Sequence, residues 1–265
     1  MTVEAGDGMA QLAVPIDRSR PYVVTGAGSG IGQAVTELLL QLDAEVVTVD
    51  LAASSPAPQD RHVSGNVAET ATWQRVVDLV GRLSDDGAAG LITCAGAIVV
   101  RDLATTPPED FERLFRVNAL GVLHGIQRLV PAMAERRDGS VVAVASVDSL
   151  FAEDRMSAYA TSKGALLQMI RSAAVEHARH GVRINAVCPG AIDTPLLRQH
   201  LNESSNPDAA RRRLEGVTPA GRLLSPLEIA HLLIFLGSPL ASAISGAAIV
   251  ADGGLTSTYD FRLED

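Results

Sequence analysis

Tyr159 and Lys163 stand four residues apart, a spacing that places both side chains on one face of a helix. A phenol beside an ammonium group suits proton transfer, because the positive charge stabilises the phenolate and lowers the pKa of the tyrosine towards working pH. The chain has three tyrosines and a single lysine, so chance gives such a pair with a probability of only about 0.01. We therefore predict that Tyr159 is a general acid/base supported by Lys163.

Ser146 closes the apolar run 141–145, upstream of Tyr159. Open parallel sheets bind ligands at the carboxyl ends of their strands, so this hydroxyl should emerge at the same edge. Serines at strand ends also form turns. Together with the tyrosine and the lysine, however, the pattern favours a catalytic Ser146 that orients a substrate oxygen and stabilises charge developing on it.

A glycine-rich turn, Thr25–Gly32, joins an apolar run to a helical pattern. Such a turn lets backbone N–H groups approach a pyrophosphate at the positive end of the helix. Asp50 follows at close to the spacing of about 20 residues expected for an acid that binds the adenosine ribose. Its carboxylate would accept the ribose hydroxyls and repel a 2′-phosphate, and neither Ser29 nor Leu51 supplies a cation for that phosphate. The turn therefore predicts NAD rather than NADP.

Strands and helices, recognised by the different spacing of their apolar residues, must position these side chains. Short apolar runs rich in β-branched residues predict buried strands at Tyr22–Thr25, Glu45–Asp50, Gly90–Cys94, Ser140–Ser146, Arg183–Cys188 and Ala247–Val250. Helical spacing predicts helices at Ile31–Leu42, Ala71–Leu83, Pro108–Arg137, Ala158–His180 and Pro226–Leu236. Strand and helix in alternation indicate an α/β fold, a doubly wound, mostly parallel Rossmann sheet with helices on both faces.

The chain reads as one domain, 21–265, after an N-terminal extension, 1–20, that we expect to be mobile. The crossover at 51–62 is too short and too rich in proline and serine for a full helix, so a loop or a single turn should replace it. Residues 195–216 are predicted to form a substrate lid. The arginines at 211–213 within it favour a solvated helix face over a grip on an acidic substrate.

Composition excludes several classes of function. The chain has 265 residues, 47% of them hydrophobic, and a formal charge of −9, so it offers no basic face for nucleic acid or anionic lipid. No apolar run is long enough to span a bilayer, and the first ten residues carry acids where a signal peptide has bases. Cys94 and Cys188 are predicted to be reduced thiols, which favours the cytoplasm, and no metal site is expected.

These motifs together resemble the short-chain dehydrogenase/reductase family over about residues 21–255, with further agreement at Asn118 and at Pro189–Gly190. The resemblance implies hydride transfer between a nicotinamide and a carbinol carbon. The positive nicotinamide ring would join Lys163 in stabilising the Tyr159 phenolate, and Asn118 would hold a water that connects Lys163 to solvent. It assigns cofactor binding to Gly26, Ser29, Gly30, Ile31, Gly32, Asp50, Asn66, Val67, Cys94, Ala95, Gly96, Tyr159, Lys163, Pro189, Gly190, Ile192 and Thr194. It also implies a homo-oligomer, a tetramer or dimer, built on the helices at 108–137 and 158–180.

Two positions depart from the family pattern. Most members have Asn-Asn-Ala-Gly where this chain has Thr93-Cys94-Ala95-Gly96, so the hydrogen bonds of an asparagine must be absent or replaced, and Cys94 is interpreted as a buried structural thiol. An Asp-Val pair usually meets the adenine, but this chain has Asn66-Val67, whose amide oxygen still accepts a hydrogen bond without carrying a charge. These changes bear on cofactor affinity rather than on reaction type.

The substrate is the least defined part of the prediction. Its pocket is expected to include Ser146, Asp148, Phe151, Tyr159, Leu196 and Leu197. Apolar residues in this set favour a cyclic or aryl secondary alcohol, although they would serve equally well in the core. The alternatives are a 2,3-dihydro-2,3-dihydroxybenzoate-type diol dehydrogenase, a 3-oxoacyl thioester reductase, and, from a different class, a catalytically silent NAD-binding sensor or scaffold.

Overall fold

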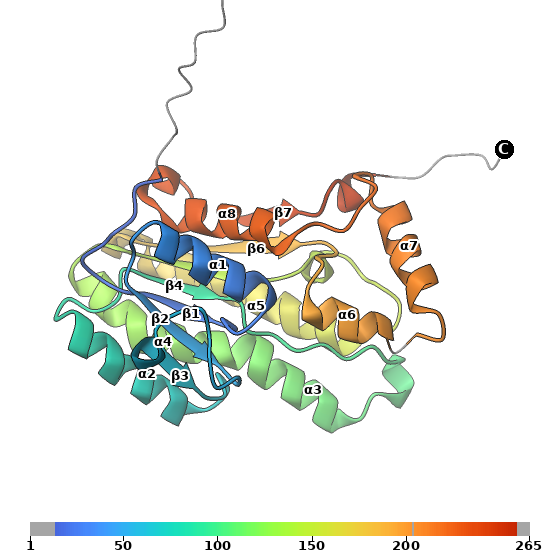
Figure 1. Ribbon diagram of the computed structural model, residues 1–265, viewed down its shortest axis with the longest axis horizontal. Coiled ribbons are helices and arrows are strands. Elements are labelled where there is room, and N and C mark those ends of the chain that lie inside the picture. Colours follow the sequence, from blue (N-terminus) through green and yellow to red (C-terminus); the bar gives the residue numbers. More distant parts are fainter. Residues whose placement is uncertain (1–13, 203, 259–265) are drawn as a thin grey trace, which may run out of the picture.

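Apolar runs covered on both faces form a single parallel sheet at the centre of the molecule (Figure 1). The structure is a computed structural model and describes residues 14–202 and 204–258. Its strands are β1 (Tyr22–Thr25), β2 (Val46–Asp50), β3 (His62–Ser64), β4 (Gly90–Thr93), β5 (Gly139–Val144), β6 (Val182–Pro189) and β7 (Ala248–Ala251). They lie in the order β3-β2-β1-β4-β5-β6-β7. The strand order reverses between β1 and β4, which places a ligand crevice at the carboxyl ends of these strands.

Helices cover both faces of the sheet, as the alternating pattern predicts. One face is covered by α1 (Gly30–Gln41) and α8 (Pro226–Gly237), and the other by α2 (Thr70–Leu83), α4 (Gly121–Glu135) and α5 (Ser157–His177) (Figure 1). The remaining helices, α3 (Pro108–Phe115), α6 (Pro195–Asn202) and α7 (Pro207–Val217), extend towards the carboxyl edge. The fold is therefore the predicted doubly wound α/β sandwich.

Successive strand residues alternate between the two layers of core. In β1, Val24 packs into the cluster beneath α1 and α8, whereas Val23 packs into the cluster beneath α2, α4 and α5. Trp73 of α2 is fully buried in the latter. Burying such side chains on both faces contributes about 1.5–3 kcal/mol for each large aliphatic residue, which is what holds the strand ends, and the groups they carry, in place.

The start of α8 shows how the sequence fixes an element. Ser225 and Pro226 predict an N-cap followed by proline at the first helical position, and both are confirmed. The Ser225 hydroxyl accepts from the backbone N–H of Glu228 (3.3 Å), and the Glu228 carboxylate accepts from the backbone N–H of Ser225 (2.8 Å). Arg222 also donates to this carboxylate and is the largest reason why the pKa of Glu228 falls to about 2.

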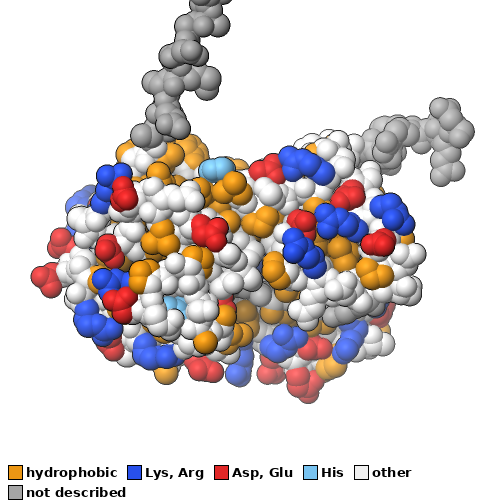
Figure 2. Space-filling model, in the orientation of Figure 1, with side chains coloured by type: hydrophobic (Ala, Val, Ile, Leu, Met, Phe, Trp, Pro, Cys, Tyr) orange, Lys and Arg blue, Asp and Glu red, His pale blue; other side chains and the backbone are white. Residues whose placement is uncertain are grey.

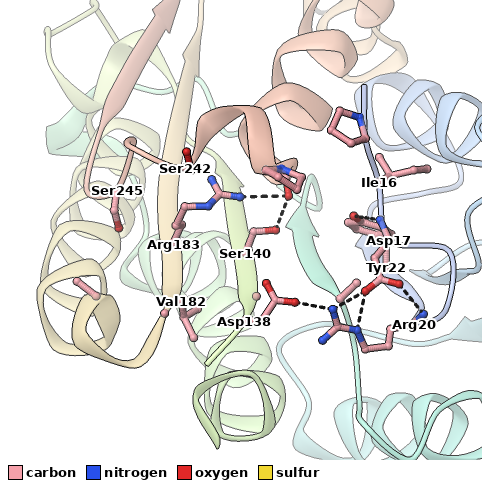
Figure 3. A pocket seen from close by; sticks show the side chains of 17 residues that line it. Ile16, Asp17, Arg20, Tyr22, Asp138, Ser140, Val182, Arg183, Ser242 and Ser245 are labelled. Carbon is pink, nitrogen blue, oxygen red and sulfur yellow. Dashed lines mark hydrogen bonds and ion pairs between the residues drawn. The ribbon is translucent and has the colours of Figure 1, made fainter. Parts of the chain in front are cut away.

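A cavity of about 640 Å³ opens at the amino edge of the sheet, opposite the ligand crevice (Figure 3). The two arginines in it, Arg20 and Arg183, point in from opposite sides. Arg183 donates to four carbonyl groups at and beyond the end of α8, those of Leu236 (2.7 Å), Gly237 (3.3 Å), Ser238 (2.9 Å) and Ala241 (3.1 Å). Arg20 is bound by the carboxylates of Asp17 and Asp138. These charges are used within the fold, so this cavity reads as structural.

Several elements differ from the predictions. The structure adds β3, a three-residue strand, and it confirms that a single 3₁₀ turn (Gln59–Arg61) stands in the crossover before it. The helix predicted at 108–137 is divided by a π-helical turn, Arg116–Leu120. The segment expected as a lid contains two helices, α6 and α7, separated by a short polar link.

The folded part of the chain begins earlier than predicted. Val14 and Ile16 pack against the core beneath α1 and α8, so at least residues 14–20 of the expected extension belong to the domain because their apolar side chains find a surface to cover. Residues 1–13 lie outside the described residues. No helix within the described ranges is long and apolar enough to cross a membrane.

The arginines at 211–213 lie on α7, and the side of the molecule formed by α6 and α7 carries basic and acidic side chains intermixed (Figure 2). Arg211 forms ion pairs with Asp193 (3.3 Å) and Glu215 (2.9 Å), while Arg212 and Arg213 are exposed. The structure thus agrees with a solvated helix face.

Candidate active site

A cavity of about 680 Å³ at the carboxyl edge gathers nearly all of the predicted site residues. Every predicted cofactor-binding residue lines it, as do Ser146, Asp148, Leu196 and Leu197. Its walls come from the turns after β1, β2, β4, β5 and β6 and from α5 and α6. Two predicted residues, Asn118 and Phe151, are not among the lining residues.

The turn after β1 is built so that only glycine fits. A Cβ on Gly32 would lie 2.2 Å from the carbonyl oxygen of Gly26, and one on Gly26 would lie 2.6 Å from the backbone nitrogen of Ala95. Gly26 also has a φ of +69°, which side chains rarely tolerate. This close packing leaves the first N–H groups of α1 facing the cavity, where an anionic pyrophosphate would be stabilised.

Asp50 at the end of β2 lies directly beside this turn. One carboxylate oxygen accepts from the backbone N–H of Gly28 (2.8 Å) and the other from that of Ala52 (2.8 Å). Each oxygen retains a lone pair for a ribose hydroxyl. The cations of the described residues that line the cavity, Arg113 and Lys163, come from α3 and α5 and not from this turn.

The segment after β3 is tied to the core through Trp73. The Trp73 Nε1–H donates to the carbonyl oxygen of Val67 (2.8 Å), which fixes the backbone at the wall where adenine is expected. The side-chain oxygen of Asn66 accepts from the backbone N–H of Ala68 (3.0 Å). One lone pair of this oxygen is therefore used within the loop, and the second remains for an adenine amine.

Thr93, the last residue of β4, and Cys94, which follows it, both differ from the family pattern. The Thr93 hydroxyl is buried and has no hydrogen-bond partner among the described residues. Cys94 was interpreted as a buried structural thiol, but it is half-buried and lines the cavity. Burial raises the pKa of Cys94 to about 12, so this thiol stays protonated.

Ser146, Tyr159 and Lys163 meet on one wall, as their positions in the sequence predict. The ring of Tyr159 lies 5.8 Å from the Lys163 Nζ, and this ammonium donates to the carbonyl oxygen of Val144 (2.8 Å). Lys163 is 4% exposed. Burial lowers its pKa to about 8, opposed by the nearby Cys94, Cys188 and Asp148 groups, so the side chain remains mostly charged at neutral pH.

The electrostatics of Tyr159 differ from expectation. We predicted a lowered pKa for its phenol, but the structure raises this pKa, chiefly through burial and further through the carboxylates of Asp148 and Glu153. A hydrogen bond with the Ser146 side chain lowers the pKa without offsetting those effects. Spacing shows that Lys163 is near Tyr159 but not how strongly burial and acids from another segment act. The lowered pKa was expected from Lys163 together with a positive nicotinamide ring, and for that complex it stays a prediction.

Ser146 is held by the loop that follows it. Its hydroxyl donates to the Asp148 carboxylate (2.8 Å) and accepts from the backbone N–H of Asp148 (3.2 Å). Burial raises the pKa of Asp148, opposed by that hydrogen bond. Asp148 was predicted as a pocket residue, and the structure adds direct hydrogen bonds between this residue and the Ser146 hydroxyl.

Asn118 lies behind the cavity wall, fully buried in the π-helical turn. Its side chain accepts from the backbone N–H of Ala97 (2.8 Å) and donates to the carbonyl oxygen of Ala97 and to the Ser162 hydroxyl (both 2.9 Å). It thereby joins the loop after β4 to α5, close to Lys163. Its predicted role in holding a water stays a prediction, since the amide itself is fully engaged in positioning these elements.

The loop after β6 closes the cavity over the glycine-rich turn. A Cβ on Gly190 would lie 3.0 Å from the Asp252 Cα, and one on Gly30 would lie 3.1 Å from the Thr194 side chain. Thr194 in turn accepts from the backbone N–H of Leu197 at the start of α6 (3.3 Å). The start of α6 is thus set against the turn that is predicted to bind pyrophosphate.

The substrate side of the cavity is partly apolar, as expected, but its lining differs from the predicted pocket in two residues. Phe151 is 54% exposed and does not line the cavity, because the 3₁₀ turn Val147–Ser149 directs the chain outward there. Glu153, which the sequence analysis missed, does line it. No motif marks Glu153; its place just ahead of α5, six residues before Tyr159, is the signal that could have found it. No group of three or more potential metal ligands occurs among the described residues.

Comparisons with known proteins agree with this geometry. A family model described as enoyl-(acyl carrier protein) reductase matches residues 26–256. The chain is 34% identical over 263 residues to a 2-(R)-hydroxypropyl-CoM dehydrogenase of Xanthobacter autotrophicus, covering 90% of this chain and 99% of the relative. It is 33% identical over 250 residues to the 3-oxoacyl-(acyl-carrier-protein) reductase of Thermotoga maritima, covering 88% and 96%.

A likeness in structure accompanies these matches in sequence. The ligand-free aldohexose dehydrogenase of Thermoplasma acidophilum matches with a TM-score of 0.86 at 27% identity, covering 94% of this chain and 98% of that one. Fold, site and relatives therefore lead to one conclusion: the chain belongs to the short-chain dehydrogenase/reductase family and is an oxidoreductase that acts on alcohol or ketone groups with a nicotinamide cofactor.

Proposed function

We propose that this enzyme interconverts a secondary alcohol and a ketone with NAD as its cofactor. The observation that carries the proposal is the meeting of Ser146, Tyr159 and Lys163 on one wall of a cavity whose far end holds Asp50 beside the glycine-rich turn. One end of this cavity suits a dinucleotide and the other suits acid/base chemistry. A sensor or scaffold would have no use for Ser146, Tyr159 and Lys163 arranged for acid/base chemistry.

The cofactor site fits NAD better than NADP. The turn around Gly26 and Gly32 leaves no room for side chains, as close approach of a pyrophosphate requires. Asp50 would accept the ribose hydroxyls, and its negative charge would repel a 2′-phosphate. Leu51, the next residue, is 74% exposed and carries no charge to compensate.

The protein groups divide the proton chemistry between them. When bound, the nicotinamide supplies the hydride acceptor or donor. Tyr159 takes the proton of the alcohol at its phenolic oxygen, or returns it to the ketone, and Lys163 supplies the positive charge that stabilises the phenolate. Ser146 holds the substrate oxygen, for which its hydroxyl must turn from the Asp148 carboxylate. The raised pKa of Tyr159 keeps the phenol protonated at neutral pH, the form from which it can give a proton to a ketone.

The body of the substrate is proposed to be apolar, cyclic or aryl, because Leu196 and Leu197 of α6, within the proposed lid at 195–216, line the cavity. The relative from Thermotoga maritima favours one second candidate, reduction of a 3-oxoacyl thioester. Use of NADPH in the reductive direction would support that candidate, and Asp50 argues against it.

The test is turnover of a panel of cyclic, aryl and aliphatic secondary alcohols and their ketones, followed by the absorbance of reduced nicotinamide. Tyr159→Phe should lower turnover by at least about 10²-fold while NAD still binds, because only the phenolic oxygen is lost. Tyr22→Phe is the matched control, since the Tyr22 hydroxyl lies at the other edge of the sheet. A Tyr159→Phe variant that keeps near-full rate would contradict the assignment.

A second prediction concerns cofactor choice. Asp50→Ala should weaken NAD binding and narrow the gap between NAD and NADP, because it removes both the hydroxyl acceptor and the charge that repels the phosphate. Titration calorimetry with each dinucleotide measures this. Asp78→Ala, an exposed acid on α2, should change neither affinity. Unchanged preference in Asp50→Ala would show that the selection is made elsewhere.

We also propose a cytoplasmic homo-oligomer, a dimer or tetramer, that pairs α4 and α5 with those of a second copy. Both helices cover the same face of the sheet, and Val175 of α5 is 78% exposed, so its apolar side chain is free to pack against a second copy. The free cysteines Cys94 and Cys188 accord with a reducing compartment.

A further inference from the structure

The substrate half of the active-site cavity carries more negative charge than the chemistry requires. Apart from Tyr159 and the thiol of Cys94, the charged or titratable residues that line the whole cavity are Asp50, Arg113, Asp148, Glu153, Lys163 and His200. Asp50 serves the cofactor turn, and Arg113 is bound by Asp110 (3.2 Å). Asp148 and Glu153 therefore remain to be explained.

These two carboxylates line the cavity that holds Ser146 and Tyr159. The Asp148 carboxylate accepts a hydrogen bond from the Ser146 hydroxyl (2.8 Å), and this hydroxyl is the group proposed to hold the substrate oxygen. Glu153 lies at the exposed rim of the same cavity, three residues before Met156, which also lines it. Both acids raise the pKa of the Tyr159 phenol, so both lie within electrostatic range of it.

Asp148 and Glu153 have no basic side chain in direct contact among the described residues, although the more distant charge of Lys163 opposes the rise in the pKa of Asp148. Asp148 and Glu153 form no ion pair with any described lysine, arginine or histidine. The nearby ammonium of Lys163 is directed to the Val144 carbonyl oxygen. The pKa of Glu153 is raised by burial and then by the charges of Asp148 and Asp154. The half-buried Asp148 and the exposed Glu153 at the rim therefore face one cavity with no described cation in contact with either carboxylate.

We propose that the substrate supplies this partner: it is an amino alcohol or amino ketone whose ammonium group lies next to the reacting carbon and binds Asp148 and Glu153. The inference rests on the proposed function and names its substrate class. A substrate oxygen at Ser146 brings the neighbouring carbon towards Asp148, because the serine hydroxyl and this carboxylate are already bonded. Ile98, Val100, Met156 and Leu197 line the same cavity and offer apolar contact to the rest of the molecule.

Charge distinguishes this class from its rivals. A neutral diol could donate to Asp148, but it would leave the repulsion between the two carboxylates in place. An acid or a phosphate ester would add a third negative charge and should be rejected. A cation relieves the repulsion of both acids at once, and the apolar lining favours an aryl or alkyl body over a polyol.

Equilibrium binding tests the inference without turnover. Benzylammonium, benzyl alcohol and benzoate share one ring and differ in charge, and calorimetry measures their binding to the enzyme saturated with NADH. We expect benzylammonium to bind at least about tenfold more tightly than benzyl alcohol, a difference of about 1.4 kcal/mol, and benzoate to bind most weakly. Equal or tighter binding of benzyl alcohol or benzoate would overturn the inference.

Variants assign the effect to the two acids. Asp148→Asn and Glu153→Gln should each reduce the preference for benzylammonium over benzyl alcohol several-fold, and Asp154→Asn, an exposed acid outside the lining, should preserve it. Glu153→Gln alters only the cavity rim, so it remains informative if Asp148→Asn does not fold. Full preference retained in Glu153→Gln and in a folded Asp148→Asn would overturn the assignment.

Turnover separates the inference from the proposed function. The secondary alcohols 2-amino-1-phenylethanol, 1-phenyl-1,2-ethanediol and mandelate carry an ammonium, a hydroxyl and a carboxylate at matched positions. We expect kcat/KM with NAD to fall in that order. A faster diol or mandelate would overturn the inference while supporting the proposed function. Selective cation binding with no oxidation of any alcohol would support the inference and contradict the proposed function.

Discussion

Among single residues, Lys163 pairs a charge with almost complete burial. Its ammonium is 4% exposed and has one hydrogen-bond acceptor, the Val144 carbonyl oxygen. Desolvation of the charged form is the largest cause of its lowered pKa, about 8 against an ordinary value of 10.5. The enzyme therefore gives up folding stability to hold a positive charge where the phenolate of Tyr159 needs it.

This cost should be visible as a dependence of stability on pH. Below about pH 8 the folded and unfolded forms both hold the Lys163 proton, and between about pH 8 and 10 only the unfolded form does. The free energy of unfolding of the wild type, relative to Lys163→Met, should therefore rise with pH in that window, by up to about 3 kcal/mol. Denaturant unfolding of both proteins at several pH values measures it. A difference that stays level across the window would contradict the lowered pKa.

Single residues were predicted from the sequence where a spacing or a strand end defines them. Tyr159, Lys163, Ser146 and Asp50 follow from local rules, and the structure places all four on the cavity. Glu153 could not be predicted, because it reaches the cavity through the path of a loop. The pKa of Tyr159 depends on such non-local carboxylates and on burial, which spacing does not encode.

Among elements, α8 is held at both ends by side chains. Ser225 and Glu228 cap its beginning, and Arg183 of β6 binds the carbonyl groups at its end. A cation at a helix C-terminus satisfies carbonyls that have no partner within the helix and interacts favourably with its dipole. This arrangement joins α8 to β6, next to the last strand of the sheet, at the edge away from the active site.

Arg183→Met should thus destabilise the fold without affecting the cofactor. We expect a loss of about 2–4 kcal/mol of unfolding free energy, since four carbonyl groups lose a charged donor. Thermal unfolding and NAD calorimetry together test it. Arg82→Met, on the exposed side of α2, serves as the control. Normal stability in Arg183→Met, or weakened NAD binding in the folded variant, would contradict this account.

Elements with a clear period were predicted, and those that depend on partners were not. The apolar strands and long helices follow from periodicity. By contrast, β3 has three residues and is defined by pairing with β2, and α6 and α7 lie in a polar stretch with little apolar period. The π-helical turn at Arg116–Leu120 leaves the helical pattern of the sequence almost unchanged, yet it contains Asn118.

At the scale of the whole molecule, two cavities lie at opposite edges of one sheet. In the cavity at the amino edge, Arg20 and Arg183 are bound by groups of the protein itself. In the cavity at the carboxyl edge, Asp50 and Lys163 face the space proposed for ligands. The sheet and its two layers of core separate these tasks. Substitutions at one edge should therefore leave the other intact, as the Arg183 prediction requires.

The proposed oligomer gives a prediction at the same scale. Val175→Arg introduces a charge on the exposed face of α5 and should lower the molar mass measured by light scattering after size exclusion, because a buried like-charge pair would form across a two-fold interface. Leu103→Arg, at another exposed apolar residue, is the control. A wild type that is monomeric, or a Val175→Arg variant of unchanged mass, would contradict the paired-helix arrangement.

The hydrogen bond between Trp73 and Val67 has an optical consequence. Trp73 is the single tryptophan of the chain, and its indole is fully buried against the segment that is expected to hold adenine. Its fluorescence therefore reports one environment, emitting at the short wavelengths of an apolar site. Reduced nicotinamide absorbs in that range, so quenching of Trp73 by energy transfer would follow occupancy of the cavity without any label.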